Sequence, residues 1–268
     1  MEDIDYEITG GGVNMSVLSA EDLVKIYSGK GKVNNTNALN GINLTIESGD
    51  FVAIMGPSGS GKTTLLNILS GIDKATSGYI EISGENINQM SRNELSLFRR
   101  QHLGFVFQEF NLLDSLTLKE NVMLPMILDN EEIDEMETKT NEVMSMFEID
   151  DIMDKYPYSV SGGQQQRTSI CRAIINDPDI IFADEPTGNL DSKSSKVVMK
   201  CFEKLNHDNK STILVVTHDP LAASYCNKVV FIKDGLINME ITKKDDKRGF
   251  SKYILDCFAE IIGENDEL

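Results

Sequence analysis

The feature that most constrains the fold is a glycine-rich octapeptide with the sequence Gly56-Pro57-Ser58-Gly59-Ser60-Gly61-Lys62-Thr63. A short apolar run, residues 51–55, precedes it, and a pattern typical of a helix, residues 63–69, follows it. Glycines let a chain turn tightly and bring its backbone N–H groups close to a ligand, where a Cβ would obstruct. The sequence therefore predicts a strand, a tight anion-binding turn and a helix in succession.

The octapeptide fits the phosphate-binding P-loop pattern, G-x-x-x-x-G-K-[ST]. Backbone N–H groups and the helix N-terminus would face the phosphates, while Lys62 reaches the terminal ones and the Thr63 hydroxyl binds Mg²⁺. The alternative is a plain glycine-rich turn, and the flanking strand and helix argue against it. We therefore expect a nucleoside triphosphate to bind at Gly56, Ser58, Gly59, Ser60, Gly61, Lys62, Thr63 and Thr64.

Three short apolar runs, residues 51–55, 180–183 and 213–216, are largely β-branched and are bounded by Gly, Asp or Thr. Continuous runs of this kind predict parallel strands that are covered on both faces, with helices between them. Residues 17–24 and 42–47 alternate apolar and polar side chains, as half-buried strands do. We therefore expect an α/β fold: a RecA-like P-loop core with a mixed sheet, an antiparallel β subdomain and an inserted helical subdomain.

The helical insertion is expected at about residues 91–165, where acidic helical patterns replace the apolar runs. One helix within it, at residues 130–147, carries a stripe that we expect to pack in the core: Ile133, Met136, Thr140, Val143, Met144 and Phe147. Residues 228–241 predict a β-hairpin around Asp234-Gly235.

The chain divides into a flexible acidic tail at residues 1–14, an ATPase domain at residues 15–245 and a C-terminal helical extension at residues 246–268. The extension has apolar residues near helical spacing, and we expect this stripe to dock on its own domain. The residues of the stripe are Ile254, Leu255, Phe258, Ile261 and Ile262.

Two adjacent carboxylates, Asp184 and Glu185, follow the apolar run at residues 180–183. A carboxylate at such a strand end supplies a second Mg²⁺ contact in P-loop proteins. Because neighbouring strand residues point to opposite sides, Asp184 can serve the metal while Glu185 faces a water. Glu185 is therefore the candidate general base, or the group that orients the water attacking the γ-phosphate. For the dipeptide alone, a solvated Asp-Glu loop is the competing interpretation.

A second segment, Val160-Ser161-Gly162-Gly163-Gln164-Gln165-Gln166-Arg167, decides among P-loop proteins. It resembles the LSGGQ signature of the ATP-binding-cassette (ABC) family, with Val160 in place of Leu. Ser161 suits the cap of a helix that begins near Gln164, and Gly162 and Gly163 would expose N–H groups to an anion. The resemblance continues in order across about residues 17–241.

The resemblance to the ABC family implies roles for further residues. Tyr27 lies where the family has an aromatic ring that stacks on adenine, and Gln108 matches the glutamine that senses Mg²⁺ and the γ-phosphate. His218 matches the histidine that holds the γ-phosphate. The implied catalytic residues are Glu185, His218 and Gln108, and the implied metal contacts are Thr63, Gln108 and Asp184.

The family resemblance also implies that the ATP site is shared. The P-loop of one subunit and the Ser161-Gly162-Gly163-Gln164 segment of another sandwich each ATP, so that one chain holds two half-sites. Asn189-Leu190-Asp191 matches the loop that contacts the opposing subunit, which makes Asp191 a further contact of the site. The implied cofactors are ATP and Mg²⁺, and the implied partners are a second copy of the chain and an integral membrane permease.

Within the family, residues 184–191 resemble the branch of macrolide exporters, lipoprotein-release ATPases and a cell-division ATPase. Residues 217–226 and 231–235 are most similar to the subunits of bacitracin-type antimicrobial-peptide resistance transporters. Two alternatives stay open: a soluble ABC ATPase of DNA repair or translation, and a cassette of a non-transport complex such as a cell-division or lipoprotein-release system. Only about a hundred residues without sustained heptads separate the P-loop from the signature, unlike the long coiled coil of repair members.

Composition limits the partners. The formal net charge is −18, which disfavours nucleic acid and anionic lipid surfaces. No stretch reaches the length of apolar sequence that a membrane helix needs. The four cysteines show no metal-site spacing and are expected to be reduced thiols. We therefore expect a cytoplasmic protein, held on the inner face of the plasma membrane through its permease.

Overall fold

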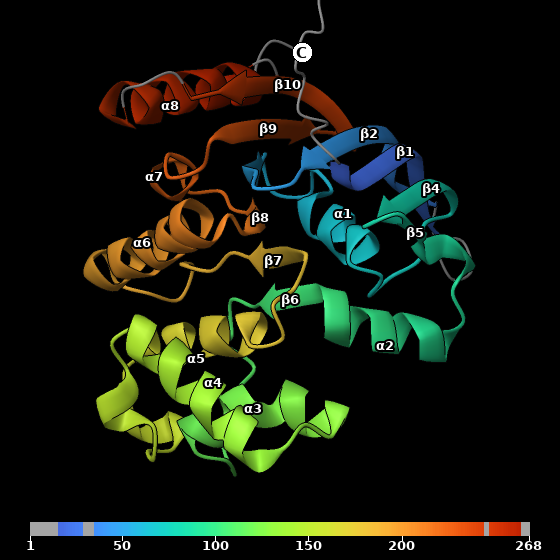
Figure 1. Ribbon diagram of the computed structural model, residues 1–268. Coiled ribbons are helices and arrows are strands. Elements are labelled where there is room, and N and C mark those ends of the chain that lie inside the picture. The colour runs from blue at the N-terminus through green and yellow to red at the C-terminus, as the bar shows by residue number, and fades with distance from the viewer. Residues whose placement is uncertain (1–15, 29–34, 244–246, 264–268) are drawn as a thin grey trace, which may run out of the picture.

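The computed structural model describes residues 16–28, 35–243 and 247–263. The predicted acidic tail at residues 1–14 lies outside the described residues. Figure 1 shows a layered α/β molecule in which helices α3–α5 lie at one end and α8 lies at the other.

A six-stranded sheet with the order β10-β9-β3-β8-β7-β6 forms the centre of the fold. Strands β9, β3, β8, β7 and β6 run parallel, and β10 pairs antiparallel with β9. The predicted mixed sheet and the predicted hairpin of β9 and β10 are therefore confirmed. The strands are β3 (Phe51–Met55), β6 (Leu103–Val106), β7 (Ile180–Asp184), β8 (Thr212–Val216), β9 (Lys228–Lys233) and β10 (Leu236–Thr242).

The central strands are buried on both faces, as their continuous apolar sequences predict. In β3, Phe51, Ala53 and Met55 belong to one hydrophobic core, while Val52 and Ile54 belong to the other. The first core fills the space between this sheet and helices α3–α8, and the second lies under α1 and a smaller sheet. Because the strands are fixed from both sides, the loops at their ends have rigid supports.

The smaller sheet is antiparallel and has the order β2-β1-β4-β5. Its strands are β1 (Ser16–Tyr27), β2 (Thr36–Glu47), β4 (Ser77–Ile82) and β5 (Glu85–Asn86). Leu18, Leu23 and Ile46 point into the second core beside Leu65 and Leu69 of α1. This sheet is the predicted antiparallel β subdomain.

The helices are α1 (Lys62–Leu69), α2 (Arg92–His102), α3 (Leu118–Asp129), α4 (Ile133–Met146), α5 (Gly162–Ile174), α6 (Ser192–Asn209), α7 (Pro220–Ala223) and α8 (Lys247–Gly263). Short 3₁₀ turns are η1 (Ile87–Gln89), η2 (Asp150–Ile152) and η3 (Pro157–Ser159). Helices α2, α3 and α5 begin with capping boxes, in which an N-cap Ser or Thr and a Glu or Gln three residues later satisfy each other's backbone N–H groups.

Some predicted core positions are wrong. Ile133 is 67% exposed, because it is the first residue of α4 and the buried face of that helix runs through Met136, Thr140 and Met144. In α8 the residues Leu255 and Ile262 are 53% and 43% exposed. The buried face of α8 is formed by Phe250, Ile254, Cys257 and Ile261, and Leu255 and Ile262 are each turned about 100° away from it.

The neighbours Ile254 and Leu255 give a matched test of how α8 packs. Ile254→Ala is expected to lower the free energy of unfolding by about 2–5 kcal/mol, because Ile254 is fully buried and its removal leaves a cavity. Leu255→Ala is expected to change it by less than about 0.5 kcal/mol. Urea denaturation of both variants measures the difference, and equal losses would contradict the packing of α8 described here.

Candidate functional site

The candidate site lies where four neighbouring parallel strands end. The glycine cradle follows β3, His218 follows β8 after one residue, Glu185 follows β7, and Gln108 follows β6 after one residue. Strands β3, β8, β7 and β6 are consecutive neighbours in the sheet. In an open α/β sheet, ligands bind beyond the carboxyl ends of the strands, so these residues share one edge suited to a ligand.

Close backbone packing forms the cradle. A Cβ on Gly56 would lie 2.1 Å from the carbonyl oxygen of Ile232, and Gly61 has φ 102°, a conformation that favours glycine. The ammonium of Lys62 donates to the carbonyl oxygens of Gly56 and Pro57, both at 2.9 Å. Helix α1 has no side-chain cap and no acidic residue in its first turn, so its N-terminal N–H groups are available to an anion.

The charges near the cradle perturb one another. Burial lowers the pKa of Lys62, although the carboxylates of Glu185 and Asp184 oppose the shift. Burial also raises the pKa of Asp184, and Glu185 adds to the rise while Lys62 opposes it. The Oδ1 atom of Asp184 is buried without a hydrogen-bond partner. A buried carboxylate oxygen in this state suits a metal or an ordered water.

Glu185 and His218 form a direct pair. Nδ1 of His218 lies 2.8 Å from Oε1 of Glu185, and the His218 side chain is 69% exposed. The backbone explains how Glu185 reaches it: β7 ends at Asp184, and Glu185 has φ 44°, with its N–H bound to the carbonyl oxygen of Val216. The alternation rule used in the sequence argument therefore does not extend to Glu185, because the chain leaves the strand there.

Gln108 lies against the loop that follows β7. Its Nε2 donates to Oδ1 of Asn189 at 3.2 Å, and Nδ2 of Asn189 donates to the backbone oxygen of Gln108 at 3.1 Å. A Cβ on Gly188 would lie 2.8 Å from the Gln108 amide, so glycine permits this approach. In this conformation the Gln108 side chain is engaged with Asn189.

Gln166 is a structural member of the site that the sequence did not reveal. It is fully buried, and its Nε2 donates to the carbonyl oxygens of Pro186 at 2.8 Å and Phe107 at 3.3 Å. It therefore joins α5 to the segments that carry Glu185 and Gln108. The available signal was helical spacing, since Gly163, Gln166 and Ile170 share the buried face of α5.

The signature segment begins α5. Ser161 caps the helix by accepting from the N–H of Gln164, as predicted, but the helix begins at Gly162, two residues earlier than expected. The space beside Gly162 is bounded by Leu190 and Phe110. Figure 1 shows α5, which this segment begins, lying apart from α1, which follows the glycine cradle. The chain therefore carries the two glycine segments at separate positions.

Asp191 and Tyr27, the two other residues predicted to contact the nucleotide, form hydrogen bonds within the chain. Asp191 caps α6, since its Oδ1 accepts from the N–H groups of Lys193 and Ser194 at 2.9 and 3.0 Å. Tyr27 is 42% exposed at the end of β1, and its hydroxyl donates to Asp73 at 2.8 Å.

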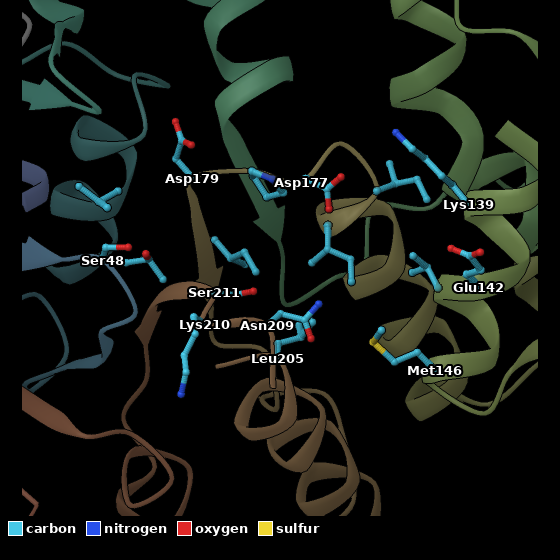
Figure 2. Close-up of a pocket in the computed structure, with 17 residues that line it drawn as sticks. Ser48, Lys139, Glu142, Met146, Asp177, Asp179, Leu205, Asn209, Lys210 and Ser211 are labelled. Carbon is cyan, nitrogen blue, oxygen red and sulfur yellow. The ribbon is translucent and has the colours of Figure 1, made fainter. Parts of the chain in front are cut away.

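A separate cavity of about 510 Å³ opens at the opposite edge of the sheet. Figure 2 shows Asp179 and Ser211, which directly precede β7 and β8, around this cavity, together with Lys139 and Glu142 of α4. No residue of the glycine cradle lines this cavity, so the cavity is distinct from the predicted nucleotide site.

Among the residues that the structure describes, no cluster of His, Cys, Asp or Glu is arranged to hold a metal ion. Within the same residues, no helix has the length and apolar character needed to cross a bilayer.

Strand order and the position of the cradle define a P-loop nucleoside triphosphatase. Comparison with known proteins narrows this class. A family model described as "ABC transporter" matches residues 39–188. The ABC transporter ATP-binding protein YvcR of Bacillus subtilis is 50% identical over 254 residues, which cover 94% of this chain and 98% of that protein.

The bacitracin export ATP-binding protein BceA of Halalkalibacterium halodurans is 49% identical over 234 residues, covering 87% of this chain and 92% of that protein. A solved dimer of the ATP-binding cassette MJ0796, from Methanocaldococcus jannaschii, represents a post-hydrolysis state with ADP and Pi. It has a TM-score of 0.78 at 39% identity and covers 85% of this chain and 100% of that chain. The chain belongs to the ABC transporter ATP-binding family, and it is an ATP-binding ATPase, the motor subunit of a transporter.

Asp184 allows a test of the charge balance. Asp184→Asn is expected to stabilise the nucleotide-free protein, because a raised pKa means that folding disfavours the charged form at neutral pH. The gain should stay below about 1 kcal/mol, since water reaches part of the carboxyl. It should vanish as the pH falls through the raised pKa. The sequence predicts that Asp184 contacts Mg²⁺, so the same variant should gain less thermal stability from Mg-ATP than the wild type does.

Thermal denaturation with and without Mg-ATP measures both effects of Asp184→Asn. Asp151→Asn removes an exposed carboxylate in η2, serves as the control and should change neither melting temperature. A lower melting temperature of nucleotide-free Asp184→Asn would contradict the assigned charge balance.

Proposed function

We propose that two copies of this chain, bound to a separate membrane permease, power resistance to antimicrobial peptides of the bacitracin kind. The observation that carries the substrate class is the likeness to the bacitracin export ATP-binding protein BceA over most of both chains. The peptide contacts the permease, and this chain supplies the ATP-driven motion. The working location is the cytoplasmic face of the plasma membrane, where the permease holds the chain.

In this proposal the triphosphate lies on the N–H groups of the cradle, and Lys62 binds its terminal phosphates. The Thr63 hydroxyl, Asp184 and Gln108 would hold Mg²⁺, which would supply positive charge beside the terminal phosphates. The unpartnered, buried Oδ1 of Asp184 and the exposed position of Thr63 support this metal site. The Gln108 side chain must first break its hydrogen bond to Asn189. Its contact with the metal therefore forms only when the nucleotide is bound.

Glu185 orients or deprotonates the attacking water, and His218 holds the γ-phosphate. The 2.8 Å contact between them supports paired action, because a carboxylate that fixes an imidazole also fixes the direction of its remaining ring nitrogen. Both groups lie at the strand edge that carries Lys62. Tyr27 stacks on the adenine base with the open part of its ring.

The second copy completes each site. Ser161, Gly162, Gly163 and Gln164 of one chain close over the ATP held by the P-loop of the other, with Asp191 beside them. The α5 N-terminus supports this role, since Gly162 and Gly163 offer backbone N–H groups without an acidic residue in the first turn. The dimeric MJ0796 cassette bound to ADP and Pi is a further support for two copies.

A groove of about 450 Å³ between α2, β6, α3 and α5 is the proposed docking site of the permease. Its apolar lining includes Phe105 and Phe107, whose rings stack at 5.8 Å, and Leu128, which is 59% exposed. Arg99 and Arg172 add cationic groups at the groove. Such a surface suits a cytoplasmic helix of the permease with apolar side chains and a carboxylate. Phe107 of the groove directly precedes Gln108, so one segment connects the docking site to the nucleotide site.

Glu185→Gln tests the proposal, because it should bind Mg-ATP, hydrolyse it very slowly and remain dimeric. Light scattering of Glu185→Gln at saturating Mg-ATP should give a dimer, and Lys62→Ala should give a monomer since it cannot hold the phosphates.

Tagged Glu185→Gln, pulled from solubilised membranes of its host with Mg-ATP, should bring down a permease, identified by mass spectrometry. Loss of that permease should sensitise the cells to bacitracin.

Leu128→Asp provides the matched control for docking. In the Glu185→Gln background it should dimerise with Mg-ATP but lose the permease, because Leu128 lies in the groove and outside the nucleotide site. A Glu185→Gln monomer at saturating Mg-ATP would contradict the shared site. Capture of a cell-division or lipoprotein-release complex, with unchanged bacitracin resistance, would replace the proposed substrate class.

A further inference from the structure

A polar network that no sequence motif marks ties Tyr27 to the segment after α1. The Tyr27 hydroxyl donates to Oδ2 of Asp73 at 2.8 Å. Nζ of Lys25 lies 2.8 Å from Oδ1 of the same carboxylate and 2.7 Å from the backbone oxygen of Lys74. Asp73 in turn is anchored to the end of α1, because its N–H donates to the carbonyl oxygen of Asn67 at 2.9 Å.

Lys25 also covers one face of the Tyr27 ring. Its Nζ lies 4.6 Å from the ring centroid, within the range of a cation–π contact. The two side chains share a face of β1 because they are two residues apart on a strand. Lys25 is only 9% exposed, while Tyr27 is 42% exposed. The ring is therefore held from one side and leaves surface open to a flat ligand.

The tie is intact at neutral pH. Burial raises the pKa of Asp73, but hydrogen bonds from Lys25, Tyr27 and Lys74 together outweigh it and bring the pKa below its usual value. A carboxyl with a lowered pKa stays charged until the pH falls through that value. Lys25 and Asp73 are thus an ion pair under the conditions in which ATP binds.

We propose that Lys25 and Asp73 are positioning residues that fix the Tyr27 ring as the surface on which adenine stacks. The inference rests on the proposed function, in which Tyr27 contacts the base. A ring that is already ordered loses less conformational freedom when the base binds. Because Asp73 follows α1, whose other end is the phosphate cradle, the base and phosphate subsites are held at the two ends of one rigid helix.

The test compares a ligand that has a base with one that lacks it. Asp73→Asn and Lys25→Met are each expected to weaken Mg-ATP binding about 3- to 10-fold, and to leave the affinity for Mg-tripolyphosphate unchanged. Tyr27→Ala should weaken Mg-ATP about 10- to 100-fold, the range for losing a base–aromatic stack. Asp73→Asn should add nothing in the Tyr27→Ala background, because both changes act through one ring. Isothermal titration calorimetry measures each affinity.

Two further variants keep the result interpretable. Tyr27→Phe retains the ring and loses only the bond to Asp73, so it should resemble Asp73→Asn even if that variant folds poorly. Glu21→Gln, at an exposed carboxylate on the same strand, should change nothing. If Asp73→Asn, Lys25→Met and Tyr27→Phe leave the ATP affinity unchanged, or weaken ATP and tripolyphosphate alike, the inference is overturned. If Tyr27→Ala itself leaves ATP binding unchanged, the adenine contact of the proposed function fails as well.

Discussion

The parallel arrangement of β3, β8, β7 and β6 is the constraint on which the rest of the structure depends. Parallel strands deliver their carboxyl ends to one edge, so Lys62 and His218, which are 156 positions apart in the sequence, both lie at that edge. Both faces of these strands are buried, which fixes the edge against movement. The 2.8 Å contact between Glu185 and His218 is a direct product of this topology.

The same edge concentrates charge that is unfavourable without a ligand. Asp184 is partly buried with a raised pKa and an unpartnered oxygen, and Lys62 has a lowered pKa beside backbone carbonyl groups. A nucleotide with its metal ion would satisfy both groups at once, because it brings anionic oxygens to Lys62 and a cation to Asp184. The formal net charge of the whole chain is −18, so the α1 N-terminus and Lys62 form a local positive region, which in the proposed function attracts the phosphates.

Local signals in the sequence predicted much of this. The apolar runs predicted β3, β7 and β8, and the serine at position 161 predicted the cap of α5. Contacts that depend on chain topology could not be predicted: the Lys25–Asp73 tie joins residues 48 positions apart, and the burial of Gln166 depends on loops from two other strands. The positive φ of Glu185 could not be predicted either, because the chain leaves the strand there and the alternation of strand side chains ends. The exposure of Leu255 was missed because approximate helical spacing did not separate it from its buried neighbour Ile254.

The central claim is that one chain holds two separate halves of an ATP site. The structure of the Glu185→Gln variant determined with Mg-ATP tests it most directly. The account predicts two nucleotides per dimer, each with its γ-phosphate between Lys62 of one copy and Ser161 of the other. A γ-phosphate enclosed by residues of a single chain, with the Ser161 segment of the second copy far from it, would contradict the account.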